Sequence, residues 1–207
     1  MGANRPFREE PKLRVESLAV ARGGRVIFEG LGFVAEAGAL VELRGANGSG
    51  KTSLLRALAG FLKPLTGRVV FENIHEPALA LHYVGHQNGL KPTASVRAHL
   101  AYWAGLLGGA VTGEDVSMTV GLAGLADLPA RVLSQGQARR LAIARLLLAP
   151  RPIWLLDEPA SALDAKGRTV LANVIEAHCA QGGLVLAAVH EPLGPSPTQV
   201  LSIGGAS

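Results

Sequence analysis

The sequence predicts an α/β fold. Short apolar runs are typical of strands buried inside a parallel sheet, and three occur, at residues 39–43, 153–156 and 184–189. Helices are expected after the first two runs, over residues 53–58 and 165–179. Hydrophobic residues make up 48% of the 207, which is enough for a full core.

An antiparallel β layer is expected beside this core. Residues 13–20 alternate between polar and apolar side chains, as a half-buried strand does. Residues 26–28 and 31–34 are interpreted as a second pair of strands, and residues 67–71 as a further strand of the layer. A turn at residues 194–197 precedes a short final strand.

A mostly helical subdomain is expected within the single domain of residues 1–207, over about residues 93–148. Its first part is rich in alanine and leucine, and apolar side chains recur at helical spacing at Val96, Leu100, Trp103 and Leu107. A further helix is predicted from Ser134 to Ala149.

A phosphate-binding loop is predicted between a strand and a helix, where the chain reads GANGSGKT. Its glycines let successive N–H groups face the phosphates, and the helix N-terminus adds positive potential. Lys51 is expected to reach the β- and γ-phosphates, and Thr52 to ligate Mg²⁺. A glycine-rich turn with a chance lysine is the alternative for this motif alone. The residues expected to contact nucleotide here are Gly45, Ala46, Asn47, Gly48, Ser49, Gly50, Lys51, Thr52 and Ser53.

Two adjacent carboxylates end the predicted strand at residues 153–156. Asp157 is expected to hold Mg²⁺, directly or through water, and Glu158 to polarise the water that attacks the phosphate. A solvated strand end is the alternative, and the upstream phosphate loop favours the catalytic interpretation.

The segment LSQGQ, residues 133–137, precedes a basic helix and resembles the LSGGQ signature of ABC ATPases, with Gln135 in place of the first glycine. This resemblance implies that Ser134, Gly136, Gln137 and the helix N-terminus grip the γ-phosphate of ATP bound to a facing subunit. N–H groups in the first turn of a helix lack intrahelical partners and are free to do so. Ser134 is also a suitable N-cap.

Three further motifs complete the resemblance, which covers essentially the whole chain. Gln87 matches the Q-loop glutamine, which contacts Mg²⁺ and the attacking water. Residues 161–164 match the D-loop, which crosses the dimer interface, and His190 matches the switch histidine that binds the γ-phosphate. The implied fold is that of ABC ATPases among P-loop NTPases, with a RecA-like core, an antiparallel β layer and a helical subdomain. ATP and Mg²⁺ are the implied cofactors.

The adenine site departs from the family pattern. ABC subunits usually place an aromatic residue upstream of the phosphate loop, and the matching turn here offers Arg22. Because a guanidinium stacks on a purine face, we expect Arg22 to contact the base.

Composition and charge limit the classes of partner expected for this chain. No apolar run approaches the roughly 20 residues of a membrane span, and residues 1–12 resemble neither a signal peptide nor an anchor. The net charge of +4, without Lys/Arg blocks interleaved with aromatic residues, argues against nucleic acid. The single cysteine, Cys179, excludes an internal disulfide. The family resemblance implies a second copy that completes an ATP sandwich and polytopic membrane subunits that supply the channel.

A finer resemblance is to the ATP-binding subunits of the haem exporters used in cytochrome c maturation. It rests on the stretch GHQNGLK at residues 85–91, WLLDEP at residues 154–159 and HEPL at residues 190–193. It implies a peripheral protein on the cytoplasmic side of the bacterial inner membrane. Lipoprotein-release or drug and lipid exporters remain the alternatives, and soluble ABC ATPases are disfavoured because long coiled-coil insertions are missing.

Residues 85–92 and 95–107 are expected to receive a coupling helix from the membrane subunit. Tyr102, Trp103 and Leu106 provide more apolar surface than one short helix needs to bury, which is typical of an interface. The alternative is that these side chains pack inside the helical subdomain. Residues 98–100 read AHL where the family usually has ENL, so this departure bears on the details of docking to the partner. His82, His86 and His99 are not expected to be haem ligands.

Overall fold

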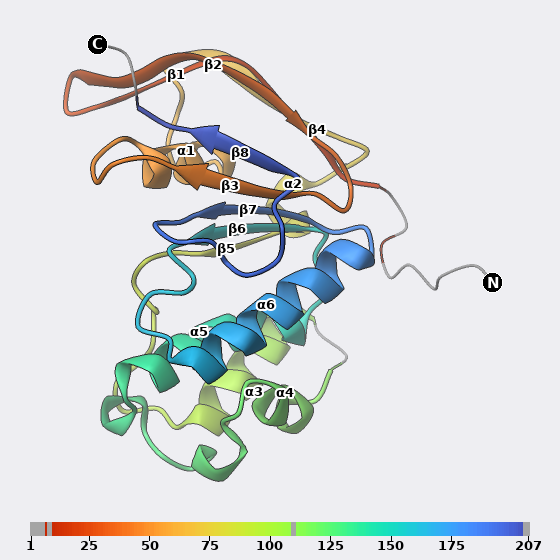
Figure 1. The fold of residues 1–207 in the computed structure, drawn as a ribbon. Coiled ribbons are helices and arrows are strands. Elements are labelled where there is room, and N and C mark those ends of the chain that lie inside the picture. Colours follow the sequence, from red (N-terminus) through yellow and green to blue (C-terminus); the bar gives the residue numbers. More distant parts are fainter. Residues whose placement is uncertain (1–6, 8–9, 109–110, 205–207) are drawn as a thin grey trace.

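The computed structural model describes Phe7, residues 10–108 and residues 111–204. Two β-sheets lie one above the other, and helices cover the far face of the larger sheet (Figure 1). The larger sheet is parallel, in the order β5-β6-β7-β3-β8. Its strands are β3 (Leu40–Arg44), β5 (Leu81–Val84), β6 (Ile153–Asp157), β7 (Leu184–Ala188) and β8 (Gln199–Ser202). Every residue of β6 and β7 is buried, which explains why these runs are apolar without alternation.

The smaller sheet is antiparallel, in the order β2-β1-β4. Its strands are β1 (Lys12–Arg22), β2 (Arg25–Ala35) and β4 (Thr66–Glu72). The expected pair of strands at residues 26–28 and 31–34 is wrong, because both segments belong to the single strand β2. Gly30, with φ +68°, lies between them in β2, and the register to β1 shifts nearby, so an irregular strand resembles two short ones in the sequence.

Helix α1 (Lys51–Leu58) packs between the two sheets. Its side chains Leu54, Leu55 and Leu58 share one core with Leu13 and Val15 of β1 and with residues of the parallel sheet. On the opposite face, Leu171 and Ile175 of α6 (Ala165–Ala180) pack on Val185 and neighbouring side chains. A short helix, α2 (Pro77–Ala80), leads directly into β5.

The predicted helical subdomain is present. It contains α3 (Val96–Leu107), α4 (Gly113–Thr119), α5 (Gln135–Leu148) and the short 3₁₀ segments η1 (Ala123–Leu125) and η2 (Ala130–Val132). Val96, Leu100 and Trp103 of α3 pack on Leu141 and Leu148 of α5 in a third core. Trp103 is therefore internal, whereas Tyr102 and Leu106 are 64% and 65% exposed.

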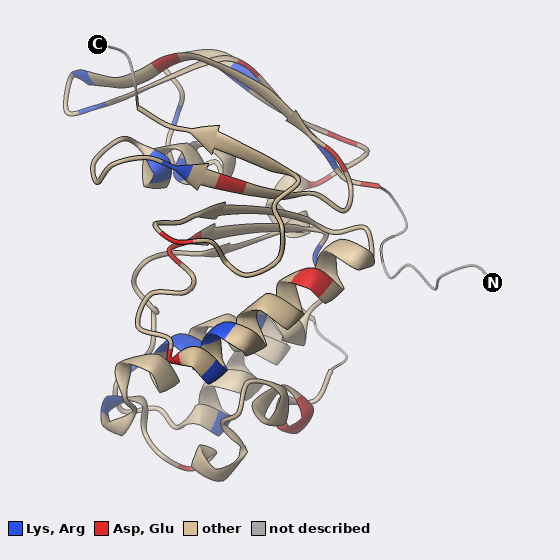
Figure 2. Ribbon diagram, viewed as in Figure 1, with Lys and Arg blue, Asp and Glu red and all other residues tan. Residues whose placement is uncertain are grey.

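Basic and acidic residues are both scattered over the ribbon (Figure 2). On the antiparallel sheet, Arg14 pairs with Glu72 at 2.8 Å and Arg68 with Glu16 at 2.6 Å. Within the described ranges, no helix has both the length and the apolar character needed to cross a bilayer.

Candidate active site

The phosphate loop connects the end of β3 to the start of α1. It forms one wall of a pocket of about 570 Å³ to which β1, β2 and the ends of β5, β6 and β7 also contribute. The lining side chains and loop residues are Arg22, Ile27, Asn47, Gly48, Ser49, Gly50, Lys51, Thr52, Ser53, Arg56, His86, Glu158 and His190. The loop and the residues after the strands thus meet at one edge of the parallel sheet.

Two glycines are required by the loop's path. Gly45 has φ +150°, and a Cβ atom there would collide with the carbonyl oxygen of Ile203. Gly50, the N-cap of α1, has φ +106°, and a Cβ atom would lie 2.5 Å from Cγ2 of Ile27. Only glycine fits both the left-handed backbone and the close contact.

Lys51 is buried inside the curve of the loop. Its ammonium group donates to the carbonyl oxygens of Gly45 at 2.8 Å and Ala46 at 3.0 Å. The first N–H groups of α1 lack intrahelical acceptors. The loop therefore combines a fixed cation with N–H donors at a helix N-terminus, which is the chemistry of an anion-binding site.

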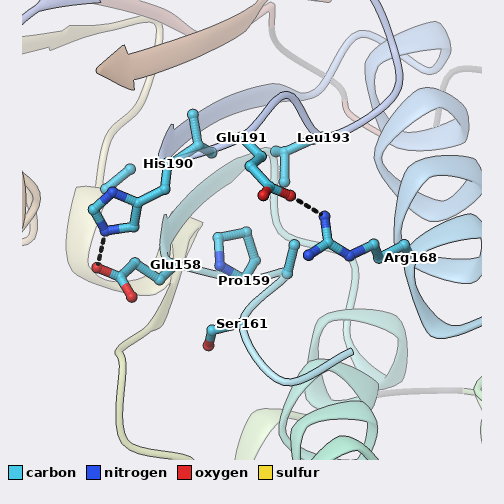
Figure 3. A pocket seen from close by; sticks show the side chains of 10 residues that line it. Glu158, Pro159, Ser161, Arg168, His190, Glu191 and Leu193 are labelled. Carbon is cyan, nitrogen blue, oxygen red and sulfur yellow. Dashed lines mark hydrogen bonds and ion pairs between the residues drawn. The ribbon is translucent and has the colours of Figure 1, made fainter. Parts of the chain in front are cut away.

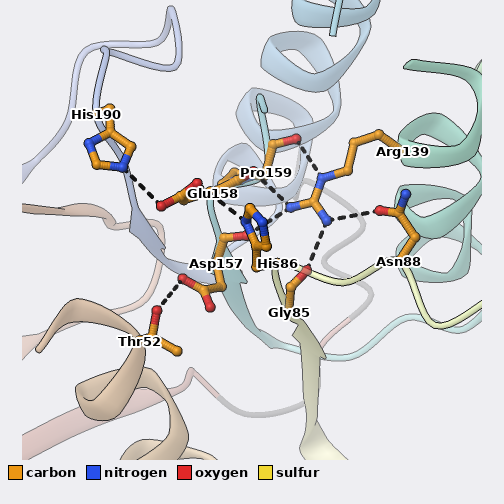
Figure 4. Close-up of polar contacts among 9 residues, drawn as sticks. All are labelled: Thr52, Gly85, His86, Asn88, Arg139, Asp157, Glu158, Pro159 and His190. Carbon is orange, nitrogen blue, oxygen red and sulfur yellow. Dashed lines mark hydrogen bonds and ion pairs between the residues drawn. The ribbon is translucent and has the colours of Figure 1, made fainter. Parts of the chain in front are cut away.

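Asp157, the last residue of β6, faces the first turn of α1. Thr52 Oγ1 donates a hydrogen bond to Asp157 Oδ1 at 2.9 Å (Figure 4). Asp157 is 1% exposed, and its second oxygen, Oδ2, is buried with no partner among the described residues. An unpaired buried carboxylate oxygen beside a hydroxyl group provides the hard oxygen ligands that Mg²⁺ takes, so these residues fit the predicted cation.

Glu158 lies between two imidazole rings. Its Oε1 is hydrogen-bonded to Nε2 of His190 at 2.9 Å, and its Oε2 lies 3.3 Å from Nδ1 of His86 (Figure 4). Its φ of +50° is unusual for a residue with a side chain, and its N–H donates to the carbonyl oxygen of Ala188 at 3.0 Å. The strained backbone turns this carboxylate toward the phosphate loop.

A smaller pocket of about 170 Å³ lies on the other side of Glu158 and His190 (Figure 3). Ser161 of the predicted D-loop lines it, and Arg168 of α6 closes it with an ion pair of 2.7 Å to Glu191. The D-loop and the switch histidine therefore border the same cavity.

The signature segment is a capped helix start. Gln137 N–H donates to Ser134 Oγ at 3.2 Å, and Ser134 N–H donates to Gln137 Oε1 at 2.8 Å, which completes a capping box. A Cβ atom on Gly136 would lie 2.8 Å from the carbonyl oxygen of Ala162, so a glycine is needed where the signature meets the D-loop. Ser134, Gly136 and Gln137 are not among the described residues that line the phosphate pocket.

Gln87 is exposed and does not belong to the described lining of the pocket, whereas its neighbour His86 does. The structure thus brings His86 to Glu158, a placement that sequence reasoning missed. The only signal available was its position beside the Q-loop glutamine. Arg22, at the end of β1, lines the pocket.

The other two histidines named above have protein partners. Nε2 of His82 is 2.9 Å from the carbonyl oxygen of Ala149, and burial lowers the pKa of His82 to about 4. Nε2 of His99 accepts from Lys91 N–H at 3.0 Å, and its Nδ1 lies 2.8 Å from the carbonyl oxygen of Ser95.

The sequence model of the ABC transporter family matches residues 28–161. The cytochrome c biogenesis ATP-binding export protein CcmA of Rhodopseudomonas palustris (strain HaA2) is 49% identical, over 95% of this chain and 100% of that protein. The protein of the same name from Nitrobacter winogradskyi is 48% identical, with the same coverage. An ABC transporter ATP-binding protein from Pyrococcus furiosus has the same fold, with a TM-score of 0.80 and 24% identity over 93% of this chain and 97% of that one. The chain therefore belongs to the ATP-binding subunits of ABC transporters and, among them, to the CcmA family.

Proposed function

We propose that this chain is the ATP-hydrolysing subunit of an ABC transporter complex that powers haem export, or haem release from its periplasmic chaperone, in c-type cytochrome biogenesis. One observation supports hydrolysis: Lys51, Thr52 and Glu158 line one pocket, and Asp157 is hydrogen-bonded to Thr52 at its wall. The names of the relatives, ATP-binding export proteins of cytochrome c biogenesis, support the transport role.

The residues divide the work of phosphoryl transfer to water. N–H groups of the loop and Lys51 bind the β- and γ-phosphates, and Glu158 accepts a hydrogen bond from the attacking water and polarises it. His190, hydrogen-bonded to Glu158, is close enough to the pocket to bind the γ-phosphate. Thr52 and Asp157 would hold Mg²⁺, with Gln87 turning inward as a third oxygen ligand, and the cation neutralises phosphate charge when bound.

A second copy of the chain is proposed to complete each site. The N-terminus of α5 carries free N–H groups, yet Ser134 and Gly136 do not line the described pocket of their own chain. These groups are available to the γ-phosphate of ATP held by a facing copy, with Gln137 supporting Ser134 through the capping box. Two nucleotides would then lie between two chains.

The adenine base of ATP is proposed to stack on the guanidinium group of Arg22. This side chain is exposed at the end of β1, and it lines the same pocket as Ile27. A guanidinium plane offers a flat surface to adenine but no hydrogen-bond pattern specific to it. We therefore infer weak selectivity for adenine over other purines.

Polytopic membrane subunits of the cytochrome c maturation complex are the proposed partners. The chain would attach to them peripherally, on the cytoplasmic side of the bacterial inner membrane, with the surface around the Q-loop and α3. Tyr102 and Leu106 on α3 present exposed apolar side chains suited to such a contact.

Replacing Glu158 by Gln tests the proposal. The amide retains the shape but is a poor acceptor for the proton of water, so we expect ATP binding to persist while kcat falls by about 10²-fold or more. ATP trapped between two copies should make the variant accumulate as a dimer, which light scattering measures. Glu176→Gln, on the exposed side of α6, is the matched control and should behave as wild type.

The transport role has a separate readout. In cells that lack the gene, wild type and Glu176→Gln should restore holocytochrome c, and Glu158→Gln should not. If the purified protein hydrolyses ATP but its loss from cells leaves holocytochrome c unchanged, the role in cytochrome biogenesis is contradicted. The proposal that the chain hydrolyses ATP would then still stand.

A further inference from the structure

Arg139, in the second turn of α5, is a buried cation whose hydrogen-bonding capacity is fully used. The residue is 1% exposed. A guanidinium group has five N–H donors, and all five have an acceptor here. The bonds run from Nε to the carbonyl oxygen of Pro159 (3.1 Å), from Nη1 to Gly85 O (2.8 Å) and Asn88 Oδ1 (3.2 Å), and from Nη2 to Asp157 O (2.8 Å) and Glu158 O (2.8 Å).

These acceptors lie at the end of β6 and in the loops that follow β6 and its neighbour β5 (Figure 4). Gly85 and Asn88 flank the segment that carries His86 and Gln87. Asp157 and Glu158 are themselves the proposed metal ligand and catalytic base. Arg139 thus connects both catalytic loops to the helix that begins at the signature.

Arg139 is stabilised by carbonyl oxygens and by the nearby carboxylates of Asp157 and Glu158. Burial lowers the pKa of Arg139 to about 10, which leaves the side chain charged at neutral pH. Four of its five acceptors are main-chain oxygens. Lysine, with three donors on a single nitrogen, cannot reproduce the planar fork that reaches them.

The contact to Glu158 lies at a strained position. Glu158 has φ +50°, and both of its peptide groups are hydrogen-bonded. Its N–H donates to Ala188 O, and its carbonyl oxygen accepts from Arg139 at 2.8 Å and from Ser161 N–H at 3.1 Å. A left-handed conformation at a residue with a side chain persists only where neighbouring contacts hold it. Removing Arg139 would leave this carbonyl oxygen only the contact with Ser161, three residues away in the same loop.

We propose that Arg139 is a positioning residue for ATP hydrolysis, which holds the Glu158 backbone and the Gly85–Asn88 segment in register with the signature helix. This inference rests on the proposed function. It predicts that the rate of the chemical step depends on Arg139 far more than nucleotide affinity does, because the phosphates bind to a different part of the site, the loop before α1.

The test compares Arg139→Lys and Arg139→Gln with a control on the same helix. Arg140 also donates two hydrogen bonds to main-chain oxygens, of Val120 and Gly121, but these lie in the helical subdomain away from the catalytic loops. For the full chain, kcat and KM for ATP, equilibrium ATP binding and thermal unfolding would be measured for each variant. Glu158→Gln is included in the same assay.

We expect both Arg139 variants to lower kcat, by up to about 10²-fold, since small displacements of a catalytic group cost this much. ATP affinity of the Arg139 variants should stay within about threefold of wild type, because the phosphates bind at the loop before α1. Arg140→Gln should keep its kcat within about twofold, because the acceptors of Arg140 lie in the helical subdomain. Folded Arg139 variants with wild-type kcat, or a kcat loss matched by an equal loss of ATP affinity, would overturn the proposal.

Asn88→Ala decides the question if the Arg139 variants do not fold. It removes one acceptor of the guanidinium from a half-buried loop, and it should lower kcat severalfold without changing ATP affinity. An unchanged kcat would count against the proposal. If instead wild type and Glu158→Gln hydrolyse ATP equally, the proposed function itself fails, which separates the two failures.

Discussion

Thr52 and Asp157 are joined by a hydrogen bond of 2.9 Å between residues 105 positions apart in the sequence. The bond links the first turn of α1 to the end of β6, and so it holds the phosphate loop beside the two adjacent carboxylates, Asp157 and Glu158. Asp157 Oδ2 remains buried without a described partner. The hydrogen bond therefore holds together the two side chains that are proposed to ligate Mg²⁺.

Asp157→Asn should abolish the dependence of activity on Mg²⁺. A neutral amide retains the hydrogen bond to Thr52 but binds a divalent cation weakly, so we expect kcat with Mg²⁺ to fall by about 10²-fold or more. Metal-free ATP binding, measured with EDTA, should be unchanged. Asp127→Asn, at an exposed ion pair with Arg97, is the control. Hydrolysis by Asp157→Asn within about twofold of wild type would contradict the metal assignment.

Lys51→Ala should weaken nucleotide binding as well as turnover. Charge-assisted hydrogen bonds to phosphate contribute about 1.5–3 kcal/mol each, so ATP affinity should fall by about 10- to 100-fold. A fluorescent ATP analogue titrated into the protein measures this affinity. Lys166→Ala, exposed on α6, should bind as wild type does. If Lys51→Ala binds ATP normally, the ammonium group does not contact the phosphates.

The sequence predicts this site well where the chemistry requires a residue type at a fixed local spacing. The phosphate loop, the carboxylates after β6 and the helix start at Ser134 are of this kind, because glycine conformations, strand ends and caps are local properties. Arg139 is different. Four of its acceptors are main-chain oxygens, which carry no signal in the residue types, and they lie 18 to 54 positions away.

The same limit explains the other differences. His86 reaches Glu158 only because β5 and β6 are neighbours, which local patterns do not specify. β2 resembles two strands because Gly30 interrupts its pattern. Asn88, a plausible surface residue in the sequence, is half-buried and bound to Arg139. In each case, a contact between segments distant in the chain decides the outcome.

The proposed membrane contact is best tested at Tyr102. This residue lies on α3 and is 64% exposed. Glutamate is a good helix former, so Tyr102→Glu should fold normally. It places a charge on the proposed contact surface. Asn88→Glu is less suitable, because it would also disturb Arg139.

Tyr102→Glu should lose co-purification with the membrane subunits and reduce holocytochrome c, since burying an unpaired charge at an interface costs several kcal/mol, about 2–5. Basal hydrolysis by the isolated chain should stay within about twofold of wild type. Asn173→Glu, exposed on α6, is the control for an added surface charge. Normal co-purification and cytochrome levels in Tyr102→Glu would exclude this surface from the contact.

The stability of the fold should fall in mild acid because two histidines are buried uncharged. His178 stacks on Trp154 with ring centroids 3.7 Å apart, and Phe7 meets its edge at 5.4 Å. Burial lowers the pKa of His178 to about 3, and that of His82 to about 4. In the unfolded chain both would titrate near the ordinary value of about 6.5.

The direction of this pH dependence follows from which state, folded or unfolded, binds the protons. Above about pH 6.5 both states are neutral at these positions, and below it only the unfolded chain binds the protons. The free energy of unfolding should therefore decrease by about 1.4 kcal/mol per pH unit for each histidine, until the folded pKa values are reached. Denaturant titrations between pH 7.5 and 5.5 measure this decrease before most carboxylates titrate.

His178→Phe isolates one of the two contributions. Phenylalanine retains an aromatic ring beside Trp154 but cannot be protonated, so the loss of stability on going from pH 7.5 to pH 5.5 should shrink by about 1.4 kcal/mol. Each protein is compared with its own stability at pH 7.5, which removes any difference in packing between the two rings. If wild type and His178→Phe lose equal stability over this range, then His178 already binds its proton in the folded protein, and its burial does not exclude the charged form.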